Sequence, residues 1–190
     1  MQKVINTLLL LLMAFLLHAC QDDAPPGDLF PVYLPGNTEN GEMSAIKSLT
    51  DWRASAHAVY HHFGQDYLAV EANTYSNDGY WRESISFSFI PVTEGVFPIN
   101  RVNQMETNKA VRANYVTLAA DGDVLEDYYI LDTLAMDNYI QVSRLDTLNQ
   151  EMEGLFTVSF ILEPGFPKLN PLNPDRLKFS YGRFKVKITN

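Results

Sequence analysis

Hydrophobic and polar residues alternate along most of this chain from residue 43 onward. The clearest case is residues 84–90, where apolar residues occupy every second position and serines stand between them. Alternation of period two is typical of a β-strand with one buried face and one face in water. The same pattern predicts further strands over 67–72, 111–118, 128–131, 139–144, 155–162, 177–181 and 184–188.

Turn-forming residues separate these predicted strands. Asn77-Asp78-Gly79, Glu94-Gly95 and Asp121-Gly122-Asp123 supply three turns, and Gly182 divides the last two predicted strands as a closing pair. A longer proline-rich loop runs through 164–174. Strands at this spacing, without a convincing amphipathic helix, predict an all-β fold: an antiparallel β-sandwich or barrel of about ten strands.

The first residues of the chain follow a different pattern. Lys3 precedes an apolar run over 4–17, which ends in Leu17-His18-Ala19-Cys20. This run is shorter than the ~20 apolar residues that span a bilayer and has the length of a signal-peptide core. Because Leu17 and Ala19 are the aliphatic and small residues expected before a lipidated cysteine, we predict a lipoprotein signal peptide over 1–19 and lipid on Cys20. An ordinary secretory signal or a transmembrane anchor is the alternative.

Residues 20–42 read as a lipidated tether, and 43–190 as the β domain. Proline and glycine are dense in the tether, as in Pro25-Pro26-Gly27. Gln21-Asp22-Asp23 resembles the surface-export signal of Bacteroidota lipoproteins, although it is also consistent with a solvated acidic linker. Both interpretations predict an outer-membrane, lipid-anchored protein, and the first predicts that it is exposed at the cell surface.

The composition of the chain argues against two classes of binding partner. The net charge is -9 and the chain has no basic run, which argues against nucleic acid and against docking of the domain itself on anionic headgroups. Cys20 is the only cysteine. Disulfides and thiol catalysis are therefore not expected once it carries lipid.

Several short motifs resemble a family of uncharacterised Bacteroidota lipoproteins with a Trp-x-Ala opening motif and C-terminal Gly-x-Phe strands. The matching segments are Ser44-Ala45-Ile46, Trp52-Arg53-Ala54-Ser55, Gly95-Val96-Phe97-Pro98-Ile99, Val142-Ser143-Arg144-Leu145-Asp146, Glu153-Gly154-Leu155-Phe156-Thr157-Val158 and Gly182-Arg183-Phe184-Lys185-Val186. The resemblance covers most of 43–190 and implies an all-β fold and a cell-envelope location. It implies no catalytic residues, and this chain departs from it in the long insertion over 163–176.

Aromatic residues crowd the first third of the domain. Exposed aromatic rings stack well on sugars. The candidate ligand contacts are therefore Tyr80 and Trp81, which follow the turn at Gly79, and Trp52. The alternative is that these large side chains fill a β core.

Two polar clusters are candidate cation sites. His57 and His61 share one face of a strand and would need a carboxylate such as Asp66 or Glu71 to begin a zinc site. The acidic segment 121–127 has oxygen ligands for calcium but not the spacing of an EF-hand. The simpler interpretations are a polar strand end and a hairpin turn, and we predict no metal and no cofactor.

The sequence contains no Gly-x-Ser-x-Gly and no His-Glu-x-x-His motif. Strand spacing alone does not show whether Glu71, Glu83, Glu94 or Asp146 forms a catalytic carboxylate pair. We therefore predict a non-enzymatic binding or accessory module at the cell envelope, with a glycan or an envelope protein as partner. The alternatives are a structural or assembly partner of an envelope complex and a glycan-active hydrolase.

Overall fold

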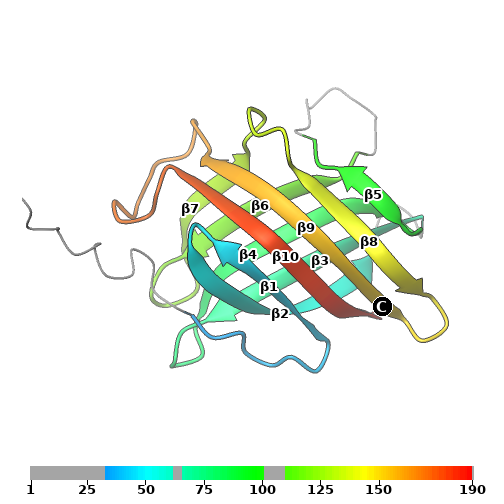
Figure 1. Ribbon diagram of the computed structural model, residues 1–190. Helices are drawn as coiled ribbons and strands as arrows, with labels where there is room; N and C mark the ends of the chain where they lie inside the picture. Colours follow the sequence, from blue (N-terminus) through cyan, green and yellow to red (C-terminus); the bar gives the residue numbers. More distant parts are fainter. Residues whose placement is uncertain (1–32, 62–65, 101–109, 190) are drawn as a thin grey trace, which may run out of the picture.

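The computed structural model describes residues 33–61, 66–100 and 110–189. The predicted signal peptide, Cys20 and the first part of the tether lie outside these residues. Within them all regular secondary structure is β, in one ten-stranded sheet, which confirms the all-β prediction (Figure 1). The strands are β1 Gly41–Lys47, β2 Thr50–Tyr60, β3 Tyr67–Tyr75, β4 Trp81–Pro91, β5 Gly95–Pro98, β6 Arg112–Leu118, β7 Leu125–Leu131, β8 Tyr139–Asp146, β9 Glu151–Leu162 and β10 Arg176–Thr189.

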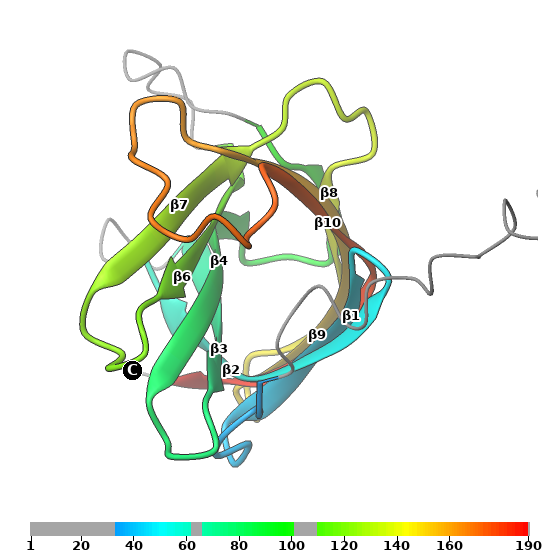
Figure 2. The ribbon, with the colours of Figure 1, turned by 90° about the vertical axis from the view of Figure 1, so that its left-hand side faces the viewer.

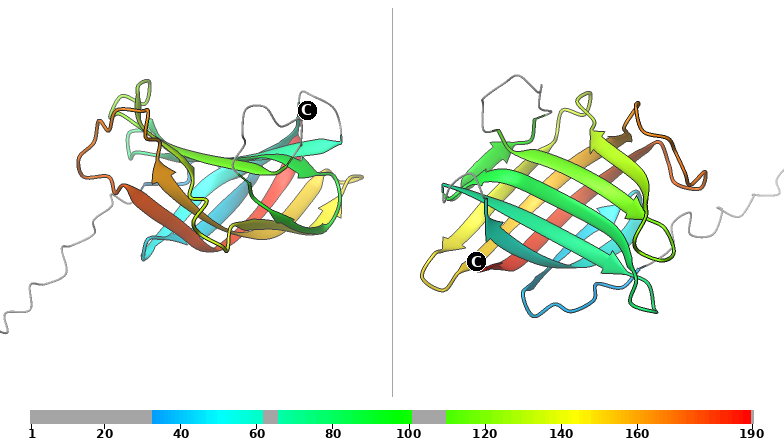
Figure 3. Two further views of the ribbon diagram at one scale, coloured as in Figure 1. Left: turned by 90° about the horizontal axis from the view of Figure 1, so that it is seen from above. Right: turned by 180° about the vertical axis from the view of Figure 1, so that it is seen from behind.

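The sheet closes on itself and is barrel-like. The order of hydrogen-bonded neighbours is β1-β10-β2-β3-β4-β6-β7-β9-β8-β5, and two additional pairings join β1 to β2 and β10 to β9. A continuous path of neighbours therefore runs from β1 through β2, β3, β4, β6, β7, β9 and β10 back to β1, with β8 and β5 attached beyond β9 (Figures 2 and 3). Among the described residues no helix has the length and apolar character to cross a membrane.

Alternating side chains fill the space that the sheet encloses. In β3, for example, Leu68, Val70, Ala72 and Thr74 point inward and are fully buried. The largest enclosed side chains are aromatic and meet at ring-centroid distances of 5.1–6.1 Å: Phe87, Tyr115, Tyr129, Phe156, Phe160 and Phe179. Aromatic rings at these separations stabilise one another beyond the effect of burial alone.

The two Gly-x-Phe segments of the chain pack reciprocally across β9 and β10. In the antiparallel register Gly154 lies opposite Phe184, and Phe156 lies opposite Gly182. A Cβ on Gly182 would come within 2.5 Å of the Phe156 ring, and one on Gly154 would come within 2.3 Å of the Phe184 ring. Each glycine therefore makes room for the phenylalanine of the neighbouring strand.

This arrangement corrects one prediction. Gly182 does not divide two strands, because β10 runs without interruption from Arg176 to Thr189. The local irregularity is a β-bulge between Phe179 and Gly182, in which Tyr181 has a φ of 54°. The glycine at 182 reflects close packing against Phe156 and not a change of chain direction.

The described end of the tether packs on the domain. Leu34 exchanges two backbone hydrogen bonds of 2.8 Å with Tyr75 at the end of β3. Arg82 donates to the Tyr33 hydroxyl at 3.2 Å. The chain therefore joins the domain next to the β3–β4 turn.

Candidate functional site

A buried carboxylate lies at the centre of a polar cluster inside the sheet. Glu83 stands on β4 in phase with Ile85 and Phe87, so the alternation that buries those two side chains turns Glu83 inward as well. It is 2% exposed. An isolated charge at such a position is strongly unfavourable, and buried charges are normally paired or hydrogen-bonded.

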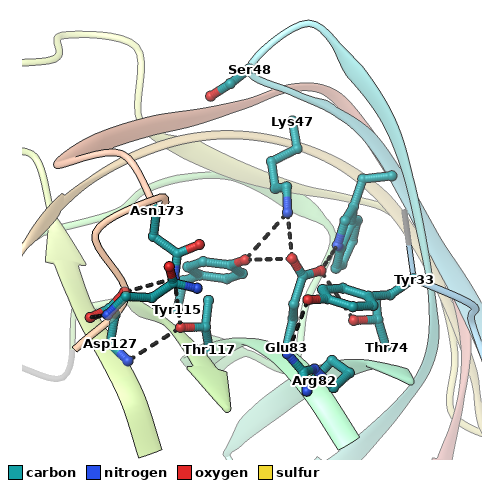
Figure 4. A network of polar contacts seen from close by, with 12 residues as sticks. Tyr33, Lys47, Ser48, Thr74, Arg82, Glu83, Tyr115, Thr117, Asp127 and Asn173 are labelled. Carbon is teal, nitrogen blue, oxygen red and sulfur yellow. Dashed lines mark hydrogen bonds and ion pairs between the residues drawn. The ribbon is translucent and has the colours of Figure 1, made fainter. Parts of the chain in front are cut away.

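Glu83 receives four hydrogen bonds, which occupy both carboxylate oxygens (Figure 4). Oε1 accepts from the Lys47 ammonium and from the Tyr115 hydroxyl, the latter at 2.8 Å. Oε2 accepts from Trp52 Nε1 at 2.7 Å and from Thr74 Oγ1 at 3.1 Å. A carboxylate offers about four acceptor positions, so this one is saturated.

Lys47 brings the opposite charge from a distant part of the chain. It is the last residue of β1, it is 4% exposed, and its Nζ also lies 3.5 Å from the Tyr115 oxygen. Burial and the neighbouring Glu83 charge both raise the pKa of Tyr115 well above its ordinary value, so this phenol stays protonated and donates. The cluster is therefore a closed arrangement of donors around one carboxylate.

A second carboxylate, Asp127, holds the proline-rich loop between β9 and β10 (Figure 4). It is fully buried at the start of β7. Its Oδ1 accepts from the backbone N–H of Leu169 at 2.8 Å, and its Oδ2 accepts from Asn173 Nδ2 at 2.6 Å. Asn173 also donates to Thr117 Oγ1 at 3.2 Å. The acidic segment 121–127 therefore supplies a loop anchor at Asp127 and a turn at Asp121, whose Oδ1 accepts from the Asp123 N–H at 3.2 Å.

The candidate aromatic contacts separate into two groups. Trp52 is 5% exposed, packs edge-on against Phe179 at 5.1 Å and donates to Glu83, so it is a core residue and does not present a surface to an external ligand. Tyr80 and Trp81 are 51% and 36% exposed at the β3–β4 turn. Trp81 is held there by a 3.0 Å bond from its Nε1 to the Glu83 carbonyl.

The two histidines have different neighbours in the fold. His57 faces Glu71 across β2 and β3, and His61 stacks on Phe89 with ring centroids 4.1 Å apart. Within the described parts of the chain no three His, Cys, Asp or Glu side chains are grouped so that they hold a metal ion.

The other candidate catalytic carboxylates have local structural partners. Glu71 accepts from Asn73 Nδ2 at 3.2 Å, and Glu94 accepts from the Leu145 N–H at 3.1 Å. Asp146 accepts from the N–H groups of Leu148 and Asn149 in its own turn, and these bonds lower its pKa. Cys20 lies outside the described residues.

The surface of the described domain has hollows at both ends of β10. One, of about 240 Å³, lies between Ser48, Asp132 and Lys178 at the end where β10 begins. The other, of about 230 Å³, lies beside Gly41, Glu151 and Lys187 near the opposite end of β10. Both are at the rim of the sheet, whereas the interior described above is occupied by side chains.

One feature of the outer surface was not predicted from the sequence. Five cationic side chains occupy alternate outward positions of β10: Arg176, Lys178, Arg183, Lys185 and Lys187. They do not form a run of consecutive basic residues, because other residues of β10 separate them in the sequence. Alternation of period two, applied to charge as well as to hydrophobicity, was the signal that could have found them.

Comparison of the chain with models of known protein families, with curated proteins and with solved structures found no match in any of the three.

Proposed function

We propose that this protein is a lipid-anchored, non-enzymatic binding module of the outer membrane. Cys20 is the attachment point, the residues after it form the tether, and the closed β domain carries the binding surface. The lipoprotein signal over 1–19 supports the anchor, and the resemblance to Bacteroidota envelope lipoproteins agrees with it.

The observation that carries the non-enzymatic part of the proposal is the saturation of Glu83. It is the one buried carboxylate among the acidic residues considered for catalysis, and all four of its acceptor positions are used. A general acid or nucleophile needs an oxygen that faces a substrate. A ligand must therefore be met on the outer surface, where side chains such as Tyr80 are accessible.

The tether limits how far the domain stands from the membrane. From Cys20 to Tyr33, the first described residue, an extended chain spans at most about 45 Å. Because Leu34 is bonded to the end of β3, the domain is attached near its β3–β4 turn.

An assembly role is the second candidate function. Three loop tips expose large apolar side chains almost completely: Leu49 at 96%, Met136 at 96% and Leu148 at 95%. Exposed apolar groups that are contiguous mark interaction surfaces. Leu49 and Met136 lie in neighbouring loops, because Ser48 and Asp137 are both bonded to Lys178.

Protease treatment of intact cells tests the anchor and the location together. The full-length protein and a Cys20→Ala variant are produced in a Gram-negative host, and the domain is followed by immunoblot after protease addition. Loss of the wild-type domain from intact cells supports a surface-exposed binding module. Protection until the outer membrane is opened overturns surface exposure and favours the assembly role, and membrane association of Cys20→Ala overturns the lipid anchor.

A further inference from the structure

The outward face of β10 concentrates positive charge in an otherwise acidic protein. The chain has a net charge of -9, yet five of its fourteen lysine and arginine residues stand on this one strand face. β10 lies between β9 and β1, with its outer face toward the viewer in Figure 1. The charge is therefore gathered into a stripe along the outside of the sheet.

Three of the five cationic side chains of the stripe form ion pairs among the described residues. Toward the start of β10, Arg176 pairs with Asp132 at 3.0 Å and Lys178 pairs with Asp137 at 2.5 Å. Toward the end of the strand, Lys185 pairs with Glu153 at 3.0 Å. Arg183, which lies between these pairs, has no ion-pair partner within 4.0 Å among the described residues.

A second arginine flanks the same position from β2. Ser44 of β1 is paired with Arg183 on one side and with Arg53 on the other, so the three residues form a row on the outer face. Arg53 is exposed and likewise lacks an ion-pair partner among the described residues. Neighbouring strands are about 4.8 Å apart, which places the two arginine backbones about 10 Å apart. Arginine side chains are long enough for both guanidinium groups to reach one anionic group above the serine.

An exposed tyrosine stands beside this row in a strained conformation. Tyr181 is 84% exposed, and its φ of 54° is uncommon for a bulky residue. It belongs to the β-bulge between Phe179 and Gly182, and bulges redirect side chains at functional sites. Leu155, directly opposite Arg183 on β9, is 38% exposed and extends the same surface. The Tyr181 ring therefore points into solvent, where it buries little surface and contributes little to the stability of the domain.

We propose that Arg53, Arg183, Tyr181 and Leu155, which we call the β10 patch, bind an anionic polysaccharide that bears carboxylate or sulfate groups. Guanidinium groups bind such oxyanions with paired, charge-assisted hydrogen bonds, and an exposed phenol ring offers a flat face to a sugar. The extended row across β2, β1, β10 and β9 suits an elongated ligand. Glu42 and Asp51 border the patch and disfavour a polyanion of high charge density such as nucleic acid. This inference rests on the proposed binding function and specifies its ligand class.

The test uses the full-length lipidated protein in detergent and measures binding to fluorescent polygalacturonate and to dextran sulfate, with dextran as the neutral control. Arg183→Gln is compared with Lys168→Gln, which removes one positive charge from the β9–β10 loop. Lys168 already pairs with Asp175 at 2.7 Å. A single-stranded DNA oligonucleotide tests whether any polyanion suffices.

We expect Arg183→Gln to weaken binding to at least one of the two anionic polysaccharides at least tenfold, and Lys168→Gln to change it less than twofold. Preference for polygalacturonate identifies carboxylate as the ligand group, and preference for dextran sulfate identifies sulfate. Equal binding of dextran, equal losses in the two variants, or tighter binding of DNA overturns the proposal. Such a failure leaves the protease result untouched, so the anchor and the ligand class are tested separately.

Discussion

The ion pair between Lys47 and Glu83 makes a sharp prediction about stability. Both side chains are almost completely buried, and they join β1 to β4. Removing one partner of such a pair leaves the other charge buried and uncompensated, at a cost of about 3–5 kcal/mol. Lys47→Met and Glu83→Gln are each expected to destabilise the domain by this amount, which is a large part of the total stability of a typical domain.

A double variant with both Lys47→Met and Glu83→Gln distinguishes the effect of an unpaired charge from the effect of altered packing. With both charges removed, the glutamine oxygen still accepts hydrogen bonds, so donors such as Trp52 Nε1 and Thr74 Oγ1 retain a partner. Neutral replacement of both members of a buried pair is much less costly than removal of one. We expect the double variant to be more stable than the sum of the single effects implies, with a coupling free energy of about 3 kcal/mol.

Urea unfolding followed by tryptophan fluorescence measures these effects, because Trp52 donates directly to Glu83. With a slope of about 2 kcal/mol/M, a loss of 3–5 kcal/mol lowers the midpoint by about 1.5–2.5 M. Single-variant shifts below about 0.5 M, or effects that add in the double variant, would refute the view that this cluster is a tightly coupled structural unit.

Four further predictions concern single positions. Gly182→Ala is expected to cost about 1–3 kcal/mol, because the new methyl group overlaps the buried Phe156 ring, and a midpoint equal to that of the wild type would contradict this packing. Asp127→Asn is expected to cost about 1.5–3 kcal/mol and to speed proteolytic cleavage within 163–175, whereas unchanged cleavage would show that the loop has other sufficient anchors. Burial raises the pKa of Tyr129 above 10.0, so the folded state keeps a proton that the unfolded state releases and stability falls as pH rises above 10.0. Tyr129→Phe should show a shallower fall in urea midpoint between about pH 9 and 11, and parallel curves for the two proteins would argue against this linkage. Tyr181→Gly removes the left-handed strain, so its unfolding midpoint should equal or exceed that of the wild type while polysaccharide binding falls, and a lower midpoint would assign Tyr181 a structural role.

The strand pattern was predictable where alternation is regular. The alternation over 84–90 identified β4, and the turn at Gly122, with a φ of 77°, is the hairpin expected from Asp-Gly. Gly182 was misread because a glycine that makes room for a ring on the next strand looks the same in sequence as a glycine in a turn. The pairing partner Phe156 is distant in the chain. Only the register of the folded strands shows that Gly182 makes room for a ring and does not form a turn.

The candidate site was harder to predict from the sequence, because its partners are also distant in the chain. Glu83 lies in phase with Ile85 and Phe87, so its inward direction was visible in the pattern. Its partner Lys47 lies 36 residues away on another strand, and nothing local indicates that the two meet. For the same reason, the sequence left open whether Trp52 contacts a ligand or fills the core, since the acceptor of its N–H is Glu83 on a distant strand.

β10 links the interior of the domain to its proposed binding face. It is paired with β9 along nearly its whole length and with β1 on the other side, and its inward residues Phe179 and Phe184 are buried. A strand fixed in this way keeps its bulge, because a shift in register by one residue would move all of its inward side chains to the outside. The packing that holds Phe184 against Gly154 therefore also fixes the outward direction of Tyr181 and Arg183. Strain at Tyr181 is tolerated because this core over-determines the strand, and a rigid strand presents a row of ligand contacts with little loss of side-chain and backbone freedom on binding.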